Sequence, residues 1–381
     1  MNHTLVIAFL LWISAARLPA AETPDRSSPL FDAARAGDLP RLKALLKPGV
    51  EVDVRDAFGE TPLMVAAVSA DERAMELLIA AGADVNARSQ AGVTPLMRAA
   101  TVESKVRLLV RHHAEVKARS GLGHTPLALA ARRPGNSATV AFLLGQGADV
   151  HSTNVFGTTP LVAAAAAGDL RTVRLLLDRG ANPNVGPNMD QDGVLFGGGR
   201  TPLMWAAFRG NLPLLRLLLE RGAKVDGFTV LGTPLSHAAW GGRVEAARLL
   251  LEAGAKVDQR DLVANYTPLH WAASAEHSDP SLAELLLAHH ADPNAEGGQP
   301  VDGFLGGVQT PLTLARLRGE TPVVKALLKA GARESAPQPV RRLPGPAWPS
   351  AAAAEEGTLT AAIALGVPPL QRTASESPLI F

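Results

Sequence analysis

The sequence predicts an all-α solenoid built from about nine helix-turn-helix repeats. The triplet Thr-Pro-Leu occurs eight times, 31 to 43 residues apart, and a recurring period of this size is typical of repeat architectures. A pair of small Ala residues follows most triplets, and most periods contain a Leu-rich run that ends at Gly. The triplets begin at Thr61, Thr94, Thr125, Thr159, Thr201, Thr233, Thr267 and Thr310.

The first helix of each repeat is expected to start at its triplet. The Thr side-chain oxygen can accept a backbone N–H from the first turn, and Pro at the first helical position loses no hydrogen bond. The clearest copy is Thr-Pro-Leu-His-Trp-Ala-Ala over residues 267–273. Ala pairs such as Ala66-Ala67 and Ala238-Ala239 indicate positions where a neighbouring helix packs closely.

A second helix is expected in each repeat from runs such as residues 173–177 and 247–251, both rich in Leu. Gly then supplies the left-handed residue that ends a helix. The sequence Ala-Asp-Val-Asn at 83–86, with its variants in other copies, leads into a loop toward the next triplet. The predicted helix-ending residues are Gly82, Gly147, Gly180, Gly222, Gly254 and Gly331.

These residues resemble the ankyrin repeat, whose signature joins Thr-Pro-Leu-His-x-Ala-Ala to a Gly-Ala-Asp-Val-Asn exit. The resemblance covers about residues 28–335, and Ser28-Pro29-Leu30 resembles the start of a degenerate first copy. Terminal copies are expected to be atypical because one of their faces meets water. The predicted copies start near residues 28, 61, 94, 125, 159, 201, 233, 267 and 310.

The N-terminus predicts export. Residues 5–13 are an apolar run followed by small residues, which favours a signal peptide over 1–21, cleaved after Ala20 or Ala21. The alternative is an uncleaved anchor, although a spanning helix needs roughly 20 apolar residues. Ankyrin repeats of eukaryotes are mostly intracellular, so the resemblance implies a bacterial protein of an exported type. We therefore expect a periplasmic or secreted protein without stable membrane insertion after cleavage.

Composition and charge exclude several function classes. Removal of Arg17 with the signal peptide leaves 36 basic and 36 acidic residues, whereas a nucleic-acid binder needs a basic stripe. The chain has no Cys, so thiolate zinc sites, Cys nucleophiles and covalent haem attachment are excluded. No phosphate-binding, dinucleotide-binding, nucleophile-elbow or His-Glu-x-x-His motif occurs. The sequence thus predicts no enzyme, no cofactor and no nucleic-acid partner.

The sequence also predicts no metal site. In His112-His113 and His289-His290, the second His occupies the position that Gly holds in other copies, and the two pairs lie five repeats apart. Residues 188–193 match the start of a calcium loop, but its twelfth position is Gly199 where a bidentate Glu is required.

Two connections exceed the repeat by roughly ten residues, from Thr159 to Thr201 and from Thr267 to Thr310. Insertions in repeat proteins map to loops on one face, which is often the binding face. The inserted segments 192–199 and 302–308 resemble each other, since both begin with Asp-Gly followed by apolar residues and Gly. Either they pack on neighbouring loops, or they carry apolar side chains toward a partner.

The resemblance places partner-facing positions just before each triplet and just after each Ala pair. In the third and fifth copies several are small, as at Ala91 and Thr101, whereas from the sixth copy onward they become aromatic or basic. Trp, Tyr and Arg dominate binding hot spots. Trp205 and Trp271 lie one turn away and either join this surface or fill space between helices, and His237 is expected to face outward. The predicted partner-binding residues are Phe196, Arg200, Phe208, Arg209, Trp240, Tyr266 and Phe304.

The C-terminal region differs in composition from the repeats over 22–335. Residues 336–349 form a Pro-rich linker, and 350–381 are expected to hold an Ala-rich helix and a tail. We predict a non-enzymatic scaffold that binds another protein through its concave face and loops. The alternatives are a docking module of a truncated cytochrome-like or enzyme subunit, and a secreted effector.

Overall fold

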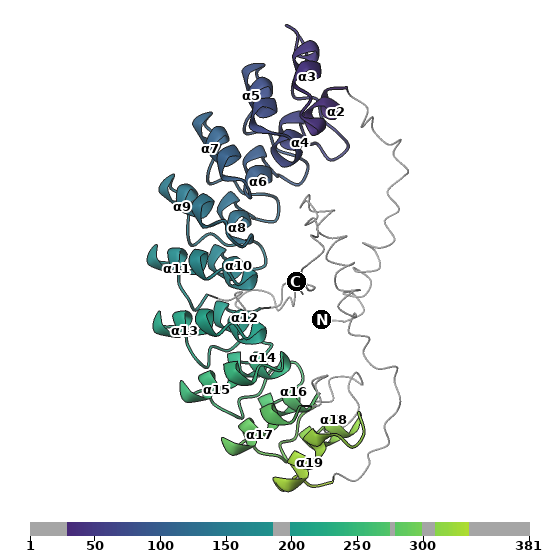
Figure 1. Cartoon of the computed structure of the whole chain (residues 1–381), viewed down its shortest axis with the longest axis vertical. Helices are drawn as coiled ribbons and strands as arrows, with labels where there is room; N and C mark the ends of the chain where they lie inside the picture. Colours follow the sequence, from purple (N-terminus) through teal and green to yellow (C-terminus); the bar gives the residue numbers. More distant parts are fainter. Residues whose placement is uncertain (1–28, 186–198, 275–278, 299–308, 335–381) are drawn as a thin grey trace, which may run out of the picture. The chain divides into compact units, whose positions relative to one another are not determined.

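The computed structural model describes residues 29–185, 199–274, 279–298 and 309–334 (Figure 1). These residues form nine helix pairs, one for each predicted copy. Within them there is no strand beyond two isolated bridges, Thr229 with Gly232 and Gly297 with Gln309. The prediction of an all-α repeat fold is confirmed.

The described helices fall into two compact units, which we describe separately. The first unit holds α2 (Pro29–Ala36), α3 (Leu39–Leu45), α4 (Pro62–Ser69), α5 (Glu72–Ala80), α6 (Pro95–Ala99) and α7 (Glu103–Arg111). The second holds α8 (Pro126–Ala131), α9 (Ser137–Gly145), α10 (Pro160–Ala167), α11 (Leu170–Asp178), α12 (Pro202–Arg209), α13 (Leu212–Glu220), α14 (Pro234–Trp240), α15 (Val244–Glu252), α16 (Pro268–Ser274), α17 (Ser281–Ala288), α18 (Pro311–Arg316) and α19 (Pro322–Lys329).

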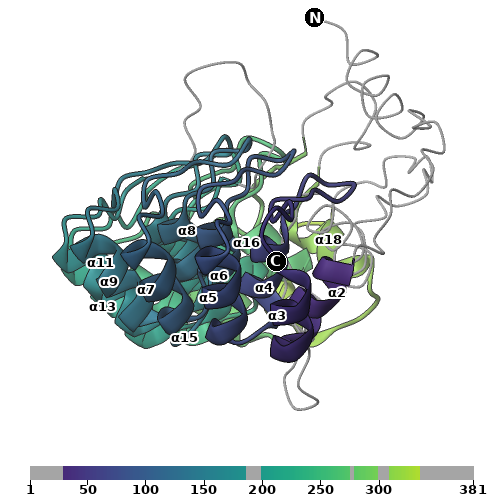
Figure 2. The same ribbon diagram turned by 90° about the horizontal axis from the view of Figure 1, so that it is seen from above.

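Each unit has two layers of helices. In the second unit, the first helices of successive copies pack side by side as α8, α10, α12, α14, α16 and α18, and we call this layer the first-helix row. The second helices pack beside one another as the second-helix row, from α9 to α19. The loops that link one copy to the next, here called finger loops, extend to one side of the helices (Figure 2). None of the described helices has the length and apolarity needed to cross a membrane.

The Thr-Pro start of the first helices is confirmed. Thr61, Thr125 and Thr159 each accept a hydrogen bond from the backbone N–H three residues later, and Pro occupies the first turn. The Thr Oγ1 to backbone N distances are 3.2 to 3.4 Å. Such caps satisfy donors that a helix start leaves without partners.

The Ala pairs and the Leu runs form the core of each unit. Ala206, Ala207, Ala238 and Ala239 are fully buried, which allows α12 and α14 to pack closely. In the second-helix row Leu side chains of several copies are fully buried, among them Leu176, Leu218, Leu250 and Leu286. Each copy therefore buries its apolar side chains largely against its neighbours, as in other repeat proteins.

The second helices end as predicted. Gly82, Gly180 and Gly254 have φ angles of 97°, 87° and 90°, the left-handed region in which Gly is favoured. His113 and His290 adopt the same conformation, with φ of 65° and 67°. The second residue of each His pair thus ends its helix, which is the structural role that its repeat position indicates.

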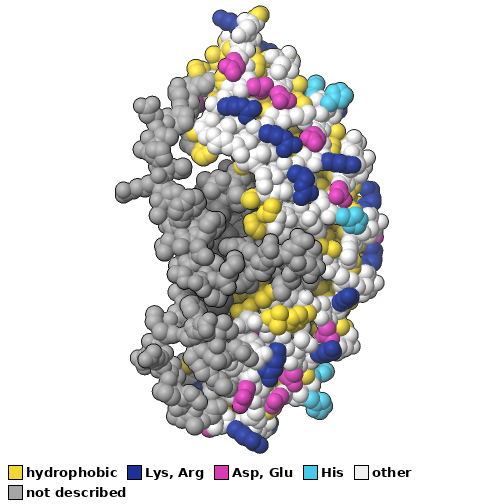
Figure 3. Space-filling view, turned by 180° about the vertical axis from the view of Figure 1, so that it is seen from behind, with side chains coloured by type: hydrophobic (Ala, Val, Ile, Leu, Met, Phe, Trp, Pro, Cys, Tyr) yellow, Lys and Arg dark blue, Asp and Glu magenta, His cyan; other side chains and the backbone are white. Residues whose placement is uncertain are grey.

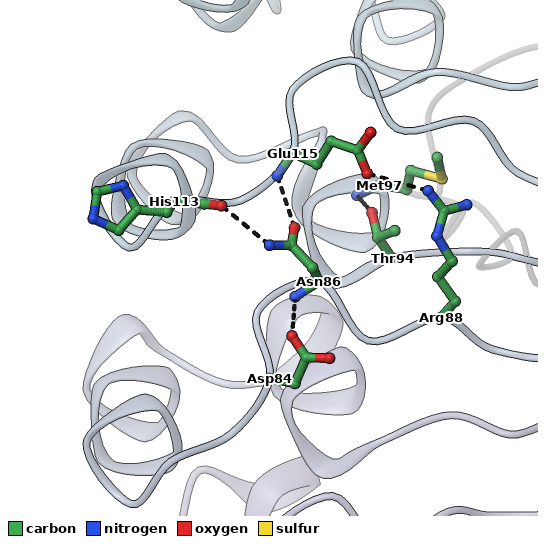
Figure 4. Close-up of polar contacts among 7 residues, drawn as sticks. All are labelled: Asp84, Asn86, Arg88, Thr94, Met97, His113 and Glu115. Atoms are coloured by element: carbon green, nitrogen blue, oxygen red, sulfur yellow. Dashed lines mark hydrogen bonds and ion pairs between the residues drawn. The ribbon is translucent and has the colours of Figure 1, made fainter.

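Asn side chains join neighbouring copies after these helix ends. The Asn86 amide donates to the carbonyl oxygen of His113 at 3.1 Å, and its Oδ1 accepts the backbone N–H of Glu115 at 2.7 Å (Figure 4). Asn184 and Asn294 make the same two bonds to the next copy, at 3.0 and 2.7 Å and at 3.1 and 2.8 Å respectively. One side chain therefore satisfies both the carbonyl group of the left-handed residue after a helix and a loop N–H.

We expect Asn86→Asp to destabilise the first unit by about 1 kcal/mol, because a carboxylate keeps the acceptor for Glu115 but loses the donor to His113. Asn86→Ala loses both bonds and should cost about 1–2 kcal/mol. Urea unfolding followed by circular dichroism measures both variants. Arg88→Ala is the matched control, since its ion pair with Glu115 is solvent-exposed and its removal should cost less than about 0.5 kcal/mol. Equal stability of Asn86→Asp and the wild type would contradict the assigned role of the donor.

Several predictions fall outside the described residues. These are the signal peptide over 1–21, the calcium-loop match at 188–193, the linker over 336–349 and the helix and tail over 350–381. Phe196 and Phe304 also lie outside.

Candidate functional site

Four aromatic side chains from three consecutive copies lie in one continuous line on the first-helix row of the second unit. They are Phe208, Trp240, Trp271 and Tyr266, and we call them the aromatic row. Ring centroids are 5.4 Å apart between Phe208 and Trp240, and 5.5 Å in the next two contacts. These distances are those of favourable aromatic pairs. Phe208 and Trp240 occupy equivalent positions of successive first helices, whereas Trp271 lies one turn earlier in α16 and Tyr266 directly precedes its triplet.

Arg200 covers one end of the aromatic row. Its guanidinium carbon lies 4.7 Å from the ring centroid of Trp205 and 4.8 Å from those of Phe208 and Trp240. Arg209 lies 6.0 Å from the same Trp205 ring. Burial, together with the nearby charge of Arg209, lowers the pKa of Arg200 to about 10. Two cations and three aromatic rings thus share one small area of α12 and α14.

Tyr266 lies at the other end of the aromatic row. Its ring stacks on His270 with centroids 4.9 Å apart, and it is only 9% exposed. A side chain at Gly297 would come within 2.6 Å of this ring, so Gly is required there. Gly297 and Gln309 exchange two backbone hydrogen bonds of 2.7 and 2.8 Å, and His270 Nε2 lies 3.1 Å from the Gln309 carbonyl oxygen. Tyr266 and His270 therefore pack at the base of the second insertion.

Trp271 is held by a carboxylate that the sequence analysis did not single out. The indole N–H donates to Asp261 Oδ2 at 2.9 Å, while Asp261 Oδ1 accepts the backbone N–H groups of Val263 and Ala264. Asp261 is 2% exposed. Its position in a finger loop near a triplet is the signal that could have identified it. The indole of Trp271 is thus fixed in place as part of the aromatic row. Trp205 is half-buried, and its ring lies next to the guanidinium groups of both Arg200 and Arg209.

The structure corrects the expectation that His237 faces outward, since His237 is 1% exposed. Its Nδ1 lies 3.0 Å from the Thr233 carbonyl oxygen, so the ring folds back along α14, and it lies 6.1 Å from the Trp240 ring. Burial and the charge of Arg200 lower the pKa of His237 to about 3. Burial also lowers the pKa of His270, to about 4.

These two histidines predict that the protein is less stable in mild acid. Unfolding returns each imidazole to a pKa near 6.5, so the unfolded chain binds protons between pH 6.5 and 4 that the folded chain does not. The stability that the two buried, neutral histidines contribute is fully present above pH 6.5 and is lost as the pH falls. His237→Leu should lose less stability than the wild type between pH 7 and 4.5, as measured by urea midpoints. His151→Leu, at an exposed position, is the control and should behave like the wild type.

The structure brings five of the seven predicted residues into one region. Arg200, Phe208 and Arg209 are partly exposed on or beside α12, and Trp240 is 38% exposed at the end of α14. Tyr266 joins them but is mostly buried, so its removal should also weaken folding. Phe196 and Phe304 belong to the two insertions, which lie outside the described residues.

Within the described part of the chain, no group of three or more His, Asp or Glu side chains could hold a metal ion. On the face shown in Figure 3, basic and acidic side chains of the described residues are interspersed. The arrangement provides aromatic surface and two cationic donors, which suits contact with another molecule.

Comparison with known proteins identifies the repeats. A family model for ankyrin repeats, in sets of three copies, matches overlapping segments 9–89, 30–120, 69–154, 103–186, 127–229, 186–261 and 231–297. A search of curated proteins finds no match. Among solved structures, the crystal structure of the human ASB11 ankyrin repeat domain is 28% identical and aligns with a TM-score of 0.51. The alignment covers 65% of this chain and 100% of that domain. The ninth copy, beyond the matched segments, is a helix pair in the structure. The chain therefore belongs to the ankyrin repeat family.

Proposed function

We propose that this protein is a non-enzymatic scaffold that binds a protein partner through the aromatic row and the adjoining finger loops of its sixth to ninth copies. Ankyrin repeats are protein–protein interaction modules. The observation that carries the proposal is the partly exposed line of Phe208, Trp240 and Trp271 beside Arg200 and Arg209. Aromatic and Arg side chains clustered on one surface are typical of binding hot spots.

Site-specific crosslinking tests this placement. The chain has no Cys, so one introduced Cys carries a photo-crosslinker at a single chosen position. Phe228→Cys places it on a finger loop beside α14, where Phe228 is 42% exposed. Arg216→Cys places it at an exposed position of α13 in the second-helix row. We expect a discrete protein adduct from position 228 and none from 216. Adducts from 216 alone would contradict the proposal.

We propose in addition that the protein is exported to the periplasm or secreted. The apolar run over residues 5–13, the small residues up to Ala21 and the absence of Cys support this setting. N-terminal sequencing of the mature protein should return a chain that begins at Ala21 or Glu22. Recovery of a chain that begins at Met1 from the cytosolic fraction would contradict export.

A further inference from the structure

The surroundings of Arg200 indicate which chemical group of the partner binds there. This inference rests on the function proposed above. Arg200 Nε is buried and has no hydrogen-bond partner within the part of the chain that the structure describes. Neither Arg200 nor Arg209 belongs to an ion pair among the described residues, although other arginines do, such as Arg221 with Asp178 at 2.7 Å. Arg200 and Arg209, at the two ends of α12, thus have no counter-charge among the residues that the structure describes.

Other arginines of the second unit donate hydrogen bonds to backbone carbonyl oxygens. Arg243 donates to the carbonyl oxygen of Phe208 at 3.1 Å, and Arg260 donates to carbonyl oxygens of Asn265 and Glu296. Arg119 donates in the same way to Thr153. Arg200 instead packs its guanidinium against three rings, and its buried Nε–H has no acceptor among the described residues. Its geometry therefore differs from that of the arginines that stabilise the fold.

The carboxylate beside the aromatic row does not neutralise the two arginines. Asp261 accepts one hydrogen bond from the Trp271 indole and two from backbone N–H groups, and among the described residues it forms no ion pair with Arg200 or Arg209. Arg200 and Arg209 are instead close enough that the charge of Arg209 lowers the pKa of Arg200. Two like charges near one ring raise the free energy of the unbound protein, and a bound anion would relieve this repulsion.

We propose that Arg200 and Arg209 recognise a carboxylate of the protein partner, supplied by an Asp or Glu side chain that is flanked by apolar residues. The guanidinium is a planar group whose fork of N–H donors matches a carboxylate. The rings of Trp205, Phe208 and Trp240 keep water away from the pair, which strengthens its attraction. Phe208 and Trp240 also offer apolar contact to the residues beside the acidic one.

Paired peptides test the charge requirement on the full chain. The probes are the blocked tripeptide acetyl-Leu-Glu-Phe-amide and its neutral counterpart with Gln in place of Glu. Binding is followed by NMR through the indole N–H signals, since three of the five Trp residues, Trp205, Trp240 and Trp271, lie at the site. We expect the Glu peptide to shift the Trp205 and Trp240 signals and to bind about 10-fold or more tightly than the Gln peptide.

Variants assign the effect to residues. Arg200→Gln should reduce binding of the Glu peptide about 10-fold or more and leave binding of the Gln peptide unchanged, because only the former uses the charge. Arg200→Lys keeps the charge but loses the fork, and should be intermediate. Arg216→Gln, at an exposed position of α13, is the matched control and should bind like the wild type. Circular dichroism checks that each variant is folded.

Three results would overturn the carboxylate assignment: equal affinity for the Glu and Gln peptides, no response to either, or unchanged Glu binding in Arg200→Gln. Inorganic phosphate is the competing anion, and binding of phosphate more tightly than the Glu peptide would assign the site to phosphorylated ligands instead. The proposed function has a separate readout. If position 228 of the otherwise unchanged chain gives the expected adduct while the peptides give one of the three contrary results, the scaffold is retained and only the carboxylate assignment is refuted.

Discussion

Replacement of Leu250 by Ala should lower the free energy of unfolding of the second unit by about 2–5 kcal/mol. Leu250 is fully buried in α15, which packs against α13, α14 and α17. The loss combines the transfer free energy of the removed methyl and methylene groups with the cost of a cavity that the neighbouring helices fill only in part. Because each copy contacts only its neighbours, a defect in the seventh copy interrupts the packing of the unit near its middle.

Urea unfolding followed by circular dichroism measures this loss. Arg248→Ala in the same helix is the matched control, because Arg248 is exposed and makes only a surface ion pair with Glu245. It should cost less than about 0.5 kcal/mol. A loss below about 1 kcal/mol for Leu250→Ala would show that the second-helix row is less tightly packed than the structure indicates.

Trp240→Ala should weaken binding of the protein partner about 30-fold or more while the protein stays folded. Removal of one hot-spot side chain costs at least about 2 kcal/mol of binding free energy. Trp240 occupies the middle of the aromatic row, is 38% exposed, and contacts Phe208, Trp271 and Arg200. Loss of the aromatic contacts that Trp240 makes within the protein should cost about 1 kcal/mol of stability. Titration of the captured partner against wild type and variant measures the change in affinity.

Two further variants separate binding from folding. Tyr266→Ala should weaken both, since the ring is buried against His270 and the Gly297 backbone, whereas Tyr266→Phe keeps the ring and should retain most of both. Phe58→Ala changes an exposed aromatic residue of the first unit and should bind normally. If Trp240→Ala bound normally and Phe58→Ala did not, the site would lie in the first unit instead.

The features that the sequence predicts correctly are those decided within one copy. Thr61 caps its own helix, and His113 adopts a left-handed conformation because its position demands one. The repeat period supplies each of these positions directly. Local rules therefore suffice for the helix pairs and their order.

The features that the sequence does not predict depend on contacts between copies. His237 is buried within reach of the charge of Arg200 from the sixth copy, and Trp271 is fixed by Asp261 in a preceding finger loop. Tyr266 is covered by Gly297, a residue of the next connection. Side-chain direction and three-dimensional neighbours decide these outcomes, and neither is expressed in the spacing of a motif.

The Asn bonds between copies have a consequence for how this family of proteins can change. The hydrogen bond between Asn86 and the backbone N–H of Glu115 closes a segment of 29 residues. The equivalent bonds between Asn184 and Lys224 and between Asn294 and Arg333 close segments of 40 and 39 residues. The same geometry is kept although the two longer segments contain the insertions. Loop-closure entropy rises only slowly with length, by about 0.6 kcal/mol for each doubling. Such loops can be lengthened, shortened or exchanged while the repeat register is preserved, so binding specificity can diversify through insertions without redesign of the scaffold.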